Sequence, residues 1–204
     1  MRQPTQRLIW FQHFHKAGGT SIVNLAKKNG ETFFPHSRNG NPFDNSGFPI
    51  RIWELSEKEI NSFIDSCKAE GISFIATEFG CPSFDAVSKR DDTLSISLLR
   101  DPLKRIVSNY EYDIHSGAVP LMSLSTYIRT LHLNHARPNY YAYMLSMHAG
   151  CGFDDAERLR IAKNNLRSVD HVYRLEDGQA LPDLCVKLGW QFYPSIANRK
   201  PTLA

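Results

Sequence analysis

Nine consecutive residues near the N-terminus combine the groups that hold a phosphate: segment 13–21 reads His-Phe-His-Lys-Ala-Gly-Gly-Thr-Ser. Two adjacent glycines let the backbone approach an anion closely, and the N–H groups that open the following helix carry partial positive charge. Lys16 adds a full charge, and Thr20 and Ser21 add hydroxyl donors. Together these residues favour an anion-binding loop. A tight turn with a helix cap is the alternative for a bare Gly-Gly pair.

A second segment, 97–110, carries another set of anion ligands. Arg100 follows an apolar run, and at a strand end its guanidinium is able to grip a phosphate through two parallel hydrogen bonds. Ser108 falls on the helix expected to follow, off its apolar stripe, and adds a hydroxyl group. An ordinary salt bridge is the alternative for Arg100, because Arg-Asp-Pro also opens many capped helices.

Both segments lie at joints in a chain where strands and helices alternate. Apolar runs rich in β-branched and aromatic residues predict buried strands at 8–14, 72–77, 94–99 and 169–174. Amphipathic stretches predict helices after each motif and near 56–70, 123–134, 138–148, 154–167 and 181–188. This alternation favours an α/β fold with a mostly parallel central sheet flanked by helices. Ligands in such sheets bind at the carboxyl ends of the strands.

Three local patterns give more specific predictions. Thr20 or Ser21 is expected to cap the first helix. Residues 31–54 are rich in Asn, Asp, Pro and Gly and are expected to form a long loop that is functional or mobile. After Asp101-Pro102, apolar residues at spacings of three, four and seven predict one buried helical stripe, made of Leu103, Ile106, Val107, Tyr110 and Ile114.

The order of groups in the first loop differs from a Walker A loop, where the lysine follows the last glycine. Here Lys16 precedes Gly18-Gly19, and the loop resembles the 5′-phosphosulfate loop of sulfotransferases that use 3′-phosphoadenosine 5′-phosphosulfate (PAPS). The likeness is to the carbohydrate branch typified by heparan sulfate sulfotransferases, whose loop often reads His-x-Pro-Lys-Thr-Gly-Gly-Thr-Ser. His15 replaces the usual proline, and Ala17 replaces a hydroxyl residue and removes one donor.

The second segment resembles the 3′-phosphate motif of the same family, Leu-Arg-Asp-Pro-x-x-Arg-x-x-Ser-x-Tyr. Arg100 and Ser108 match its ligand positions, and Arg105 matches a position expected to be structural. The resemblance covers about residues 8–112. It implies a single P-loop-like, three-layer sulfotransferase domain over 1–204, which moves a sulfuryl group from PAPS to an acceptor hydroxyl. A carbohydrate is the expected acceptor, because the glycine loop resembles that of the carbohydrate branch.

The resemblance also assigns roles to residues. Lys16 is expected to stabilise the leaving-group oxygen, and Arg100 with Ser108 to hold the 3′-phosphate. The 5′-phosphate is expected to lie against the backbone N–H groups of residues 17–21, with His15 within reach of it. No metal is required, because the lysine and the helix dipole take its place.

The general base is left open. The family places a His or Glu after the second core strand, where this chain has Glu78. A tuned carboxylate there is able to accept the hydroxyl proton, although a pairing with lysine or a turn cap is an equal alternative. His13 is the competing candidate, but its place inside a strand favours a core or supporting role.

Two further groups are weaker candidates. The late basic loop at 198–201 includes Arg199 and Lys200, which match the place where sulfotransferases often clasp the 3′-phosphate; a solvated tail is the alternative. Tyr140, Tyr141 and Tyr143, with Arg137, would line an acceptor cleft, although tyrosines on one helix face more often belong to a core.

Composition limits the class of protein. The chain has 204 residues, 42% of them hydrophobic, so it is able to build a packed core. A net charge of +3 argues against a protein that coats nucleic acid but suits a site for a small polyanion.

No apolar stretch approaches the roughly 20 residues that span a bilayer, and the short polar N-terminus lacks the apolar part of a signal peptide. The four cysteines are widely spaced and form no zinc motif; Cys67 and Cys185 fall on apolar helix faces and are expected to be buried thiols.

A cytoplasmic setting is the default expectation, and an excised lumenal domain of a membrane-anchored enzyme is the alternative. Two other functions compete with sulfuryl transfer. One is a nucleotide-dependent phosphotransferase with an unusual P-loop, although Walker order and a magnesium carboxylate are not evident. The other is a non-catalytic nucleotide-binding domain on the same fold, which the departures at His15 and Ala17 favour.

Overall fold

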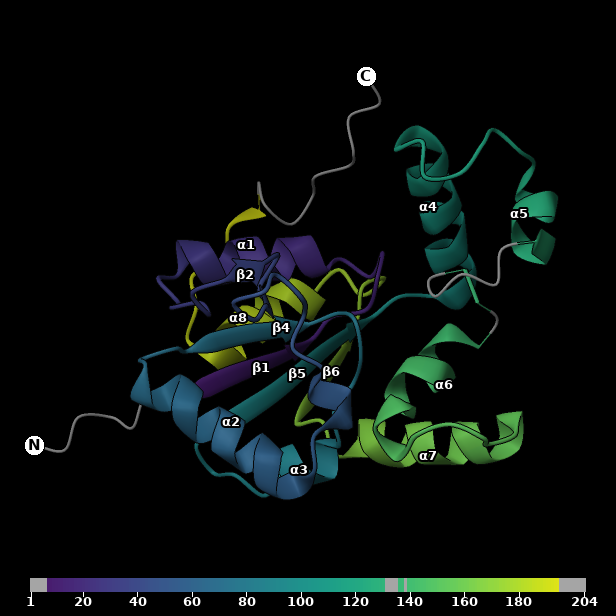
Figure 1. Cartoon of the computed structure of the whole chain (residues 1–204). Coiled ribbons are helices and arrows are strands. Elements are labelled where there is room, and N and C mark those ends of the chain that lie inside the picture. Colours follow the sequence, from purple (N-terminus) through teal and green to yellow (C-terminus); the bar gives the residue numbers. More distant parts are fainter. Residues whose placement is uncertain (1–6, 131–135, 138, 195–204) are drawn as a thin grey trace, which may run out of the picture.

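The computed structural model describes residues 7–130, 136–137 and 139–194. At its centre lies a four-stranded sheet in the order β4-β1-β5-β6, in which every neighbouring pair is parallel (Figure 1). The strands are β1 (Leu8–Gln12), β4 (Phe74–Thr77), β5 (Thr93–Leu99) and β6 (His171–Arg174). β4 and β5 lie on opposite sides of β1, so the direction in which strands are added to the sheet reverses at β1. Parallel α/β sheets bind ligands at such a reversal, beyond the carboxyl ends of the strands.

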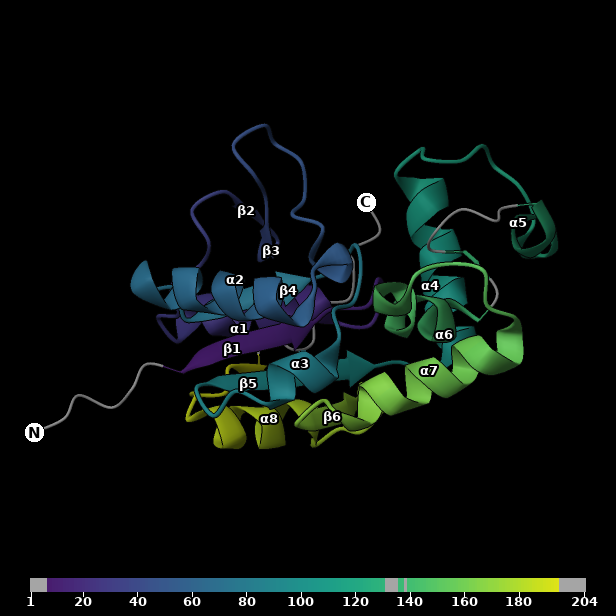
Figure 2. The same ribbon diagram turned by 60° about the horizontal axis from the view of Figure 1, so that its bottom comes forward.

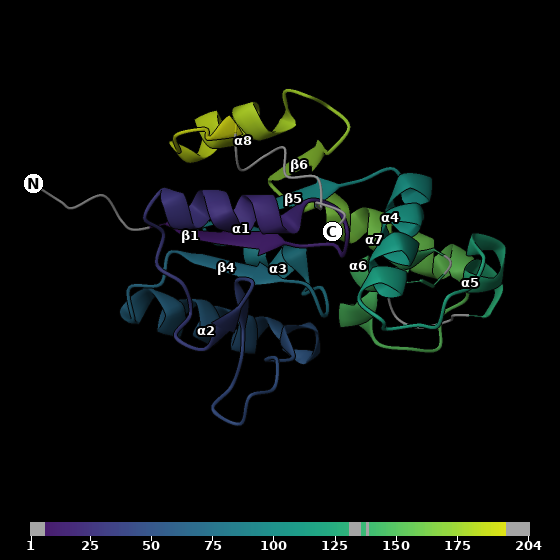
Figure 3. The ribbon, with the colours of Figure 1, turned by 90° about the horizontal axis from the view of Figure 1, so that it is seen from above.

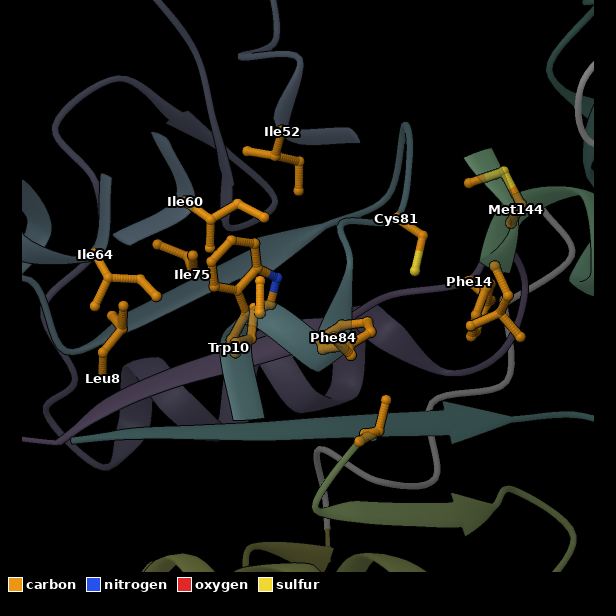
Figure 4. Packing of buried hydrophobic residues seen from close by; sticks show 14 of the residues in the cluster. Leu8, Trp10, Phe14, Ile52, Ile60, Ile64, Ile75, Cys81, Phe84 and Met144 are labelled. Carbon is orange, nitrogen blue, oxygen red and sulfur yellow. The ribbon is translucent and has the colours of Figure 1, made fainter. Parts of the chain in front are cut away.

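Helices cover both faces of this sheet because successive β1 side chains point in opposite directions. Leu8 and Trp10 pack in a cluster with α2 (Glu57–Ala69) and α3 (Phe84–Ser88), as Figure 4 shows for Trp10, Ile60 and Phe84. Ile9 and Phe11 pack on the other face against α1 (Gly19–Lys28) and α8 (Ala180–Leu188). Seen from above in Figure 3, the sheet lies between these two helical layers. The predicted α/β fold class with three layers is confirmed.

Four further helices lie past the carboxyl ends of the strands (Figures 1 and 2). They are α4 (Pro102–His115), α5 (Leu124–Thr130), α6 (Tyr140–Leu145) and α7 (Asp155–Arg167). Ser56 and Glu59 form a capping box at the start of α2, and the Asp101 side chain caps the first turn of α4 by accepting from the N–H groups of Leu103 and Lys104. This group of helices faces the end of the sheet where ligands are expected.

The predicted apolar stripe of α4 is wrong in part. Leu103 is 75% exposed and Val107 is 37% exposed, whereas the buried positions of the helix are Arg105 and Asn109. The other three members of the stripe pack around a small cluster centred on Tyr127, and they are Ile106, Tyr110 and Ile114. The helix extends past the sheet instead of lying on it. One side packs against the Tyr127 cluster, and another side, with Tyr112, faces the loop after β1.

Segment 31–54 is more ordered than a long loop. It contains a small antiparallel hairpin, β2 (Ser37–Arg38) with β3 (Asn41–Pro42), and a 3₁₀ turn, η1 (Ile52–Glu54). Asn41 and Ile52 are buried. No periodic apolar pattern predicts such short strands, which are held by contacts with β4.

Other boundaries differ by a few residues. The first strand ends at Gln12, and His13 follows it with its N–H still donating to the Thr77 carbonyl at the end of β4. The helix predicted at 138–148 divides into α6 and a 3₁₀ turn, η2 (Met147–Ala149). Cys67 and Cys185 are buried, free thiols, as predicted. Within the described ranges, none of the helices has the length and apolar character needed to cross a bilayer.

Candidate anion-binding and catalytic site

The loop after β1 has two residues in left-handed backbone conformation. Lys16 has a φ of 61° and Gly18 a φ of 83°, and α1 begins directly after them at Gly19. Thr20 and Ser21 therefore lie inside the helix, and the predicted side-chain cap is wrong: Gly18 is the N-cap and makes no side-chain bond. A lysine with positive φ costs free energy that surrounding contacts must offset, a feature that clusters at functional sites.

The second glycine allows α1 to start directly against a histidine. A Cβ on Gly19 would lie 1.9 Å from the imidazole of His13, which is buried and stacked on the ring of Phe11. Burial lowers the pKa of His13, and the repulsion of His15 and Lys16 lowers it further against the opposing effect of Glu78. His13 is thus held neutral beneath the loop, which fits the supporting role that the sequence favoured over catalysis.

Two backbone N–H groups expected to hold phosphate are already engaged. Ala17 donates to the Phe14 carbonyl at 3.0 Å and Ser21 donates to the Gly18 carbonyl at 3.0 Å, so these bonds shape the turn. For the N–H groups of Gly18, Gly19 and Thr20, no backbone acceptor outside α1 is found in the described part of the chain. These three amides at a helix N-terminus are therefore the ones in the loop that are available to an anion.

The Lys16 ammonium lies over the ring of Tyr112 on α4, 4.1 Å from its centroid. Burial lowers the pKa of Lys16, and the nearby Arg100 guanidinium lowers it further. Asp113, Glu78 and Glu111 act in the opposite sense. The lysine is therefore partly desolvated and lies near a second cation.

Arg100 reaches the glycine loop from the end of β5. Its Nη1 atom donates to the carbonyl oxygen of Lys16 at 3.1 Å, which places guanidinium and loop in direct contact. Two segments about eighty residues apart in the sequence thus meet at neighbouring strand ends, β1 and β5. The contact joins the two predicted phosphate motifs in one site.

Two tyrosines of α6 fix the backbones of both segments. The Tyr140 hydroxyl accepts from the His15 N–H at 3.1 Å, and the Tyr141 hydroxyl both accepts from the Arg100 N–H at 3.0 Å and donates to its carbonyl at 2.9 Å. Arg105 lies buried over the Tyr140 ring at 4.0 Å, consistent with its expected structural role. Tyr140 is buried and both hydroxyls hold loop backbone, which fits the core alternative for these tyrosines better than an acceptor cleft.

Ser108 is half-buried on α4, and the structure shows no direct contact between it and the loop among the described residues. It lies four residues before Tyr112, so the two share a helix face, and that face carries the ring under Lys16. Arg137 lies 3.6 Å from the Tyr143 ring centroid, in a separate contact. Arg199 and Lys200, the proposed clasp on the 3′-phosphate, fall outside the described residues.

Glu78 follows β4 and turns toward the first loop. Its Oε1 atom lies 2.9 Å from the Nδ1 of His15, and its Oε2 atom lies 3.3 Å from the Nδ1 of His13. The backbone N–H of Glu78 donates to the buried Asn41 side chain at 2.6 Å. The predicted alternative of a lysine pair is not what the structure shows, since both carboxylate oxygens face imidazoles.

Two participants were not predicted from the sequence: Tyr112 lies under Lys16, and Asn41 accepts from the backbone of Glu78. His15 was expected within reach of the 5′-phosphate, and the structure pairs its imidazole with Glu78. The position of Tyr112, twelve residues after Arg100 on an amphipathic helix, was the one available hint. His15 meets Glu78 through the parallel pairing of β1 and β4, and Asn41 meets it because the β2–β3 hairpin packs against β4, where the Ala76 N–H donates to the Gly40 carbonyl.

The assembled groups suit the transfer of a charged group. Cations and helix amides converge where negative charge would be held, and a carboxylate–imidazole pair lies beside them to receive a proton. Among the described residues, no three His, Cys, Asp or Glu side chains gather as metal ligands. The expectation that no metal is needed stays a prediction.

Comparison with known proteins does not add a relationship. No family model matches the chain, and no curated protein gives a significant match. The function must accordingly be argued from the site.

Proposed function

We propose that this protein is a PAPS-dependent sulfotransferase that moves a sulfuryl group to an acceptor hydroxyl. The observation that supports this most directly is the contact of 3.1 Å between Arg100 Nη1 and the Lys16 carbonyl. It brings two cationic side chains and the amides of Gly18–Thr20 to one place at the carboxyl ends of β1 and β5. PAPS carries phosphate at both ends of its nucleoside and needs two such groups of ligands.

In the proposed reaction, the acceptor oxygen attacks sulfur as the bond from sulfur to the 5′-phosphate oxygen breaks. The amides of the loop hold the 5′-phosphate, and the Lys16 ammonium leaves the Tyr112 ring to stabilise the charge that develops on the leaving oxygen. Arg100 and Ser108 hold the 3′-phosphate. The acceptor proton passes to the carboxylate–imidazole group around Glu78.

A carbohydrate is the acceptor class we favour. The resemblance of the glycine loop to that of carbohydrate sulfotransferases suggests it, and two partly exposed aromatic rings support it. Tyr112 is 50% exposed on the α4 side of Lys16, and Phe79 is 43% exposed next to Glu78. Flat apolar rings at the mouth of a polar site suit the faces of sugar rings, which combine apolar C–H groups with hydroxyls.

Calorimetry with the desulfated product, 3′-phosphoadenosine 5′-phosphate (PAP), tests the proposal without knowledge of the acceptor. Wild-type protein should bind PAP in the absence of magnesium, and ATP should compete poorly. Arg100→Ala removes a charged contact and should weaken PAP binding by roughly 2–3 kcal/mol.

Arg160→Ala is the matched control, because Arg160 is an exposed arginine on α7 that pairs with Glu157. It should bind PAP as the wild type does. Unchanged affinity in Arg100→Ala would remove Arg100 from the site. Tight, magnesium-dependent binding of ATP would instead favour the phosphotransferase, and PAP binding without transfer to any acceptor would favour a non-catalytic domain.

A further inference from the structure

The pairing of His15 with Glu78 defines which imidazole nitrogen is basic. The distance from His15 Nδ1 to Glu78 Oε1 is 2.9 Å and has hydrogen-bond geometry. An ionised carboxylate can only accept, so the neutral imidazole must carry its proton on Nδ1. The lone pair then resides on Nε2, and a carboxylate that orients an imidazole in this way also stabilises the imidazolium that forms when Nε2 takes a proton.

The other histidine beside Glu78 does not have this arrangement. His13 Nδ1 lies 3.3 Å from Glu78 Oε2 but forms no hydrogen bond. Its side chain is only 5% exposed, against 19% for His15 and 14% for Glu78. Of the three groups, His15 is the most accessible to an acceptor.

His15 also lies next to the group assigned to the leaving oxygen. Its ring meets the Tyr112 ring edge-on with centroids 5.8 Å apart, and the Lys16 ammonium lies 4.1 Å from the centroid of the same ring. A base for the acceptor and a cation for the leaving group must flank one sulfur atom. His15 and Lys16 both contact the Tyr112 ring, so they lie on the same side of the site with that ring between them.

We propose that His15 is the general base of the reaction and that Glu78 is its positioning residue; this inference rests on the proposed sulfotransferase function. As the acceptor oxygen bonds to sulfur, its proton passes to His15 Nε2. The bond from sulfur to the bridging oxygen breaks with its electron pair on PAP, where Lys16 offsets the charge. Glu78 stabilises the imidazolium, which returns its proton to solvent before the next cycle.

The chemistry of the two side-chain types favours this division of roles. An imidazole ordinarily titrates about two pH units above a carboxylate and so is the better proton acceptor near neutral pH. Glu78 is held in place at several points: His15 and His13 face its carboxylate, and Asn41 holds its backbone. A carboxylate fixed in this way is suited to orient a neighbour.

Three variants measured at saturating PAPS separate the roles. His15→Ala should lower kcat by about 10²–10⁴-fold, and added imidazole should restore part of it by filling the vacated space. Glu78→Gln should lower kcat by about 10-fold while KM for the acceptor changes little. His36→Gln, an exposed histidine on the β2 side, is the matched control and should keep wild-type turnover.

The pH profile gives a second readout. The groups that face His15 are Glu78 after β4, His13 after β1, Lys16 in the loop, Tyr112 on α4 and Tyr140 on α6. In the wild type, kcat should rise with pH along one limb and then level off. His15→Ala should abolish the limb, because the group that accepts the proton is then missing.

Nuclear magnetic resonance of ¹⁵N-labelled histidine tests the pair without an acceptor. His15 should show the Nδ1–H tautomer in the wild type, because Nδ1 faces the Glu78 carboxylate. An Nε2–H tautomer would overturn the inference. So would near-wild-type turnover in His15→Ala, or a larger loss in Glu78→Gln than in His15→Ala with no rescue by imidazole.

The two proposals fail in different ways. Active wild-type protein with an unaffected His15→Ala variant would overturn the role of His15 and leave the sulfotransferase proposal intact. Wild-type protein that transfers no sulfuryl group, or that fails to bind PAP, would overturn both. PAP affinity should stay within about two-fold of wild type in His15→Ala, since the Arg100 and amide contacts remain.

Discussion

At Gly19 the lack of a side chain decides how closely α1 approaches the end of β1. The backbone there is ordinary helix, so an alanine would suffer no φ strain, but its Cβ would lie 1.9 Å from the His13 ring. His13 is buried and stacked on Phe11, so it has little room to move. Gly19→Ala should therefore lower the free energy of unfolding by about 1–3 kcal/mol, measured by urea denaturation.

Gly178→Ala is the matched control for this prediction. No atom lies within 4 Å of a Cβ built on Gly178, and its φ is not in the left-handed range. That variant should be neutral or slightly stabilised, because alanine lowers the entropy of the unfolded chain. Equal stability of the two alanine variants would show that His13 yields freely and that the close approach is not required.

At the scale of elements, α6 connects the two anion-binding segments through its tyrosine hydroxyls. Tyr141→Phe keeps the ring but leaves the Arg100 N–H without its acceptor and the Arg100 carbonyl without its donor. The unmade bonds should cost about 1–3 kcal/mol of stability. PAP should also bind more weakly, because Arg100 is held less firmly. Thermal unfolding and calorimetry measure the two effects.

Tyr143→Phe is the control within the same helix. Its ring would keep the contact with Arg137, and the hydroxyl that it loses makes no hydrogen bond to described residues. Both stability and PAP affinity should stay near those of the wild type. If Tyr141→Phe behaves the same way, α6 packs beside the loops without fixing them.

For the whole molecule, the buried imidazole of His13 makes folding stability depend on pH. Burial lowers the pKa of His13 in the folded state, whereas in the unfolded chain the imidazole titrates normally, near pH 6.5. Below that pH the unfolded chain binds more protons, so stability is fully present above about 6.5 and is lost as pH falls toward the folded pKa. The slope should reach at most about 1.4 kcal/mol per pH unit for this group.

Urea denaturation at pH 7, 6 and 5 measures this slope in the wild type and in His13→Gln. The variant should lose less stability across the range, since glutamine does not titrate. The comparison isolates His13 from Glu78, His15 and Lys16, which act on the same imidazole. Parallel curves for the two proteins would mean that another group controls the acid response.

Local sequence patterns were enough to predict the fold class and the local character of both loops. Strand and helix periodicity is a local property of the chain, and so is the placement of lysine, glycine and arginine at strand ends. The predicted start of α1 and the predicted apolar stripe of α4 were wrong. Both features depend on residues distant in the sequence, which set how closely a helix can approach and the direction in which it leaves the sheet.

Which side chains meet in the site could not be predicted from these local patterns. The parallel pairing of β1 with β4 and β5 brings Glu78 and Arg100 to the loop at His15 and Lys16. Segment 31–54 adds Asn41, and α4 adds Tyr112. The sequence patterns around these two residues predicted no part for them in the site. A side chain's role depends on the partners within a few ångströms, and those partners are fixed by packing between elements that are distant along the chain.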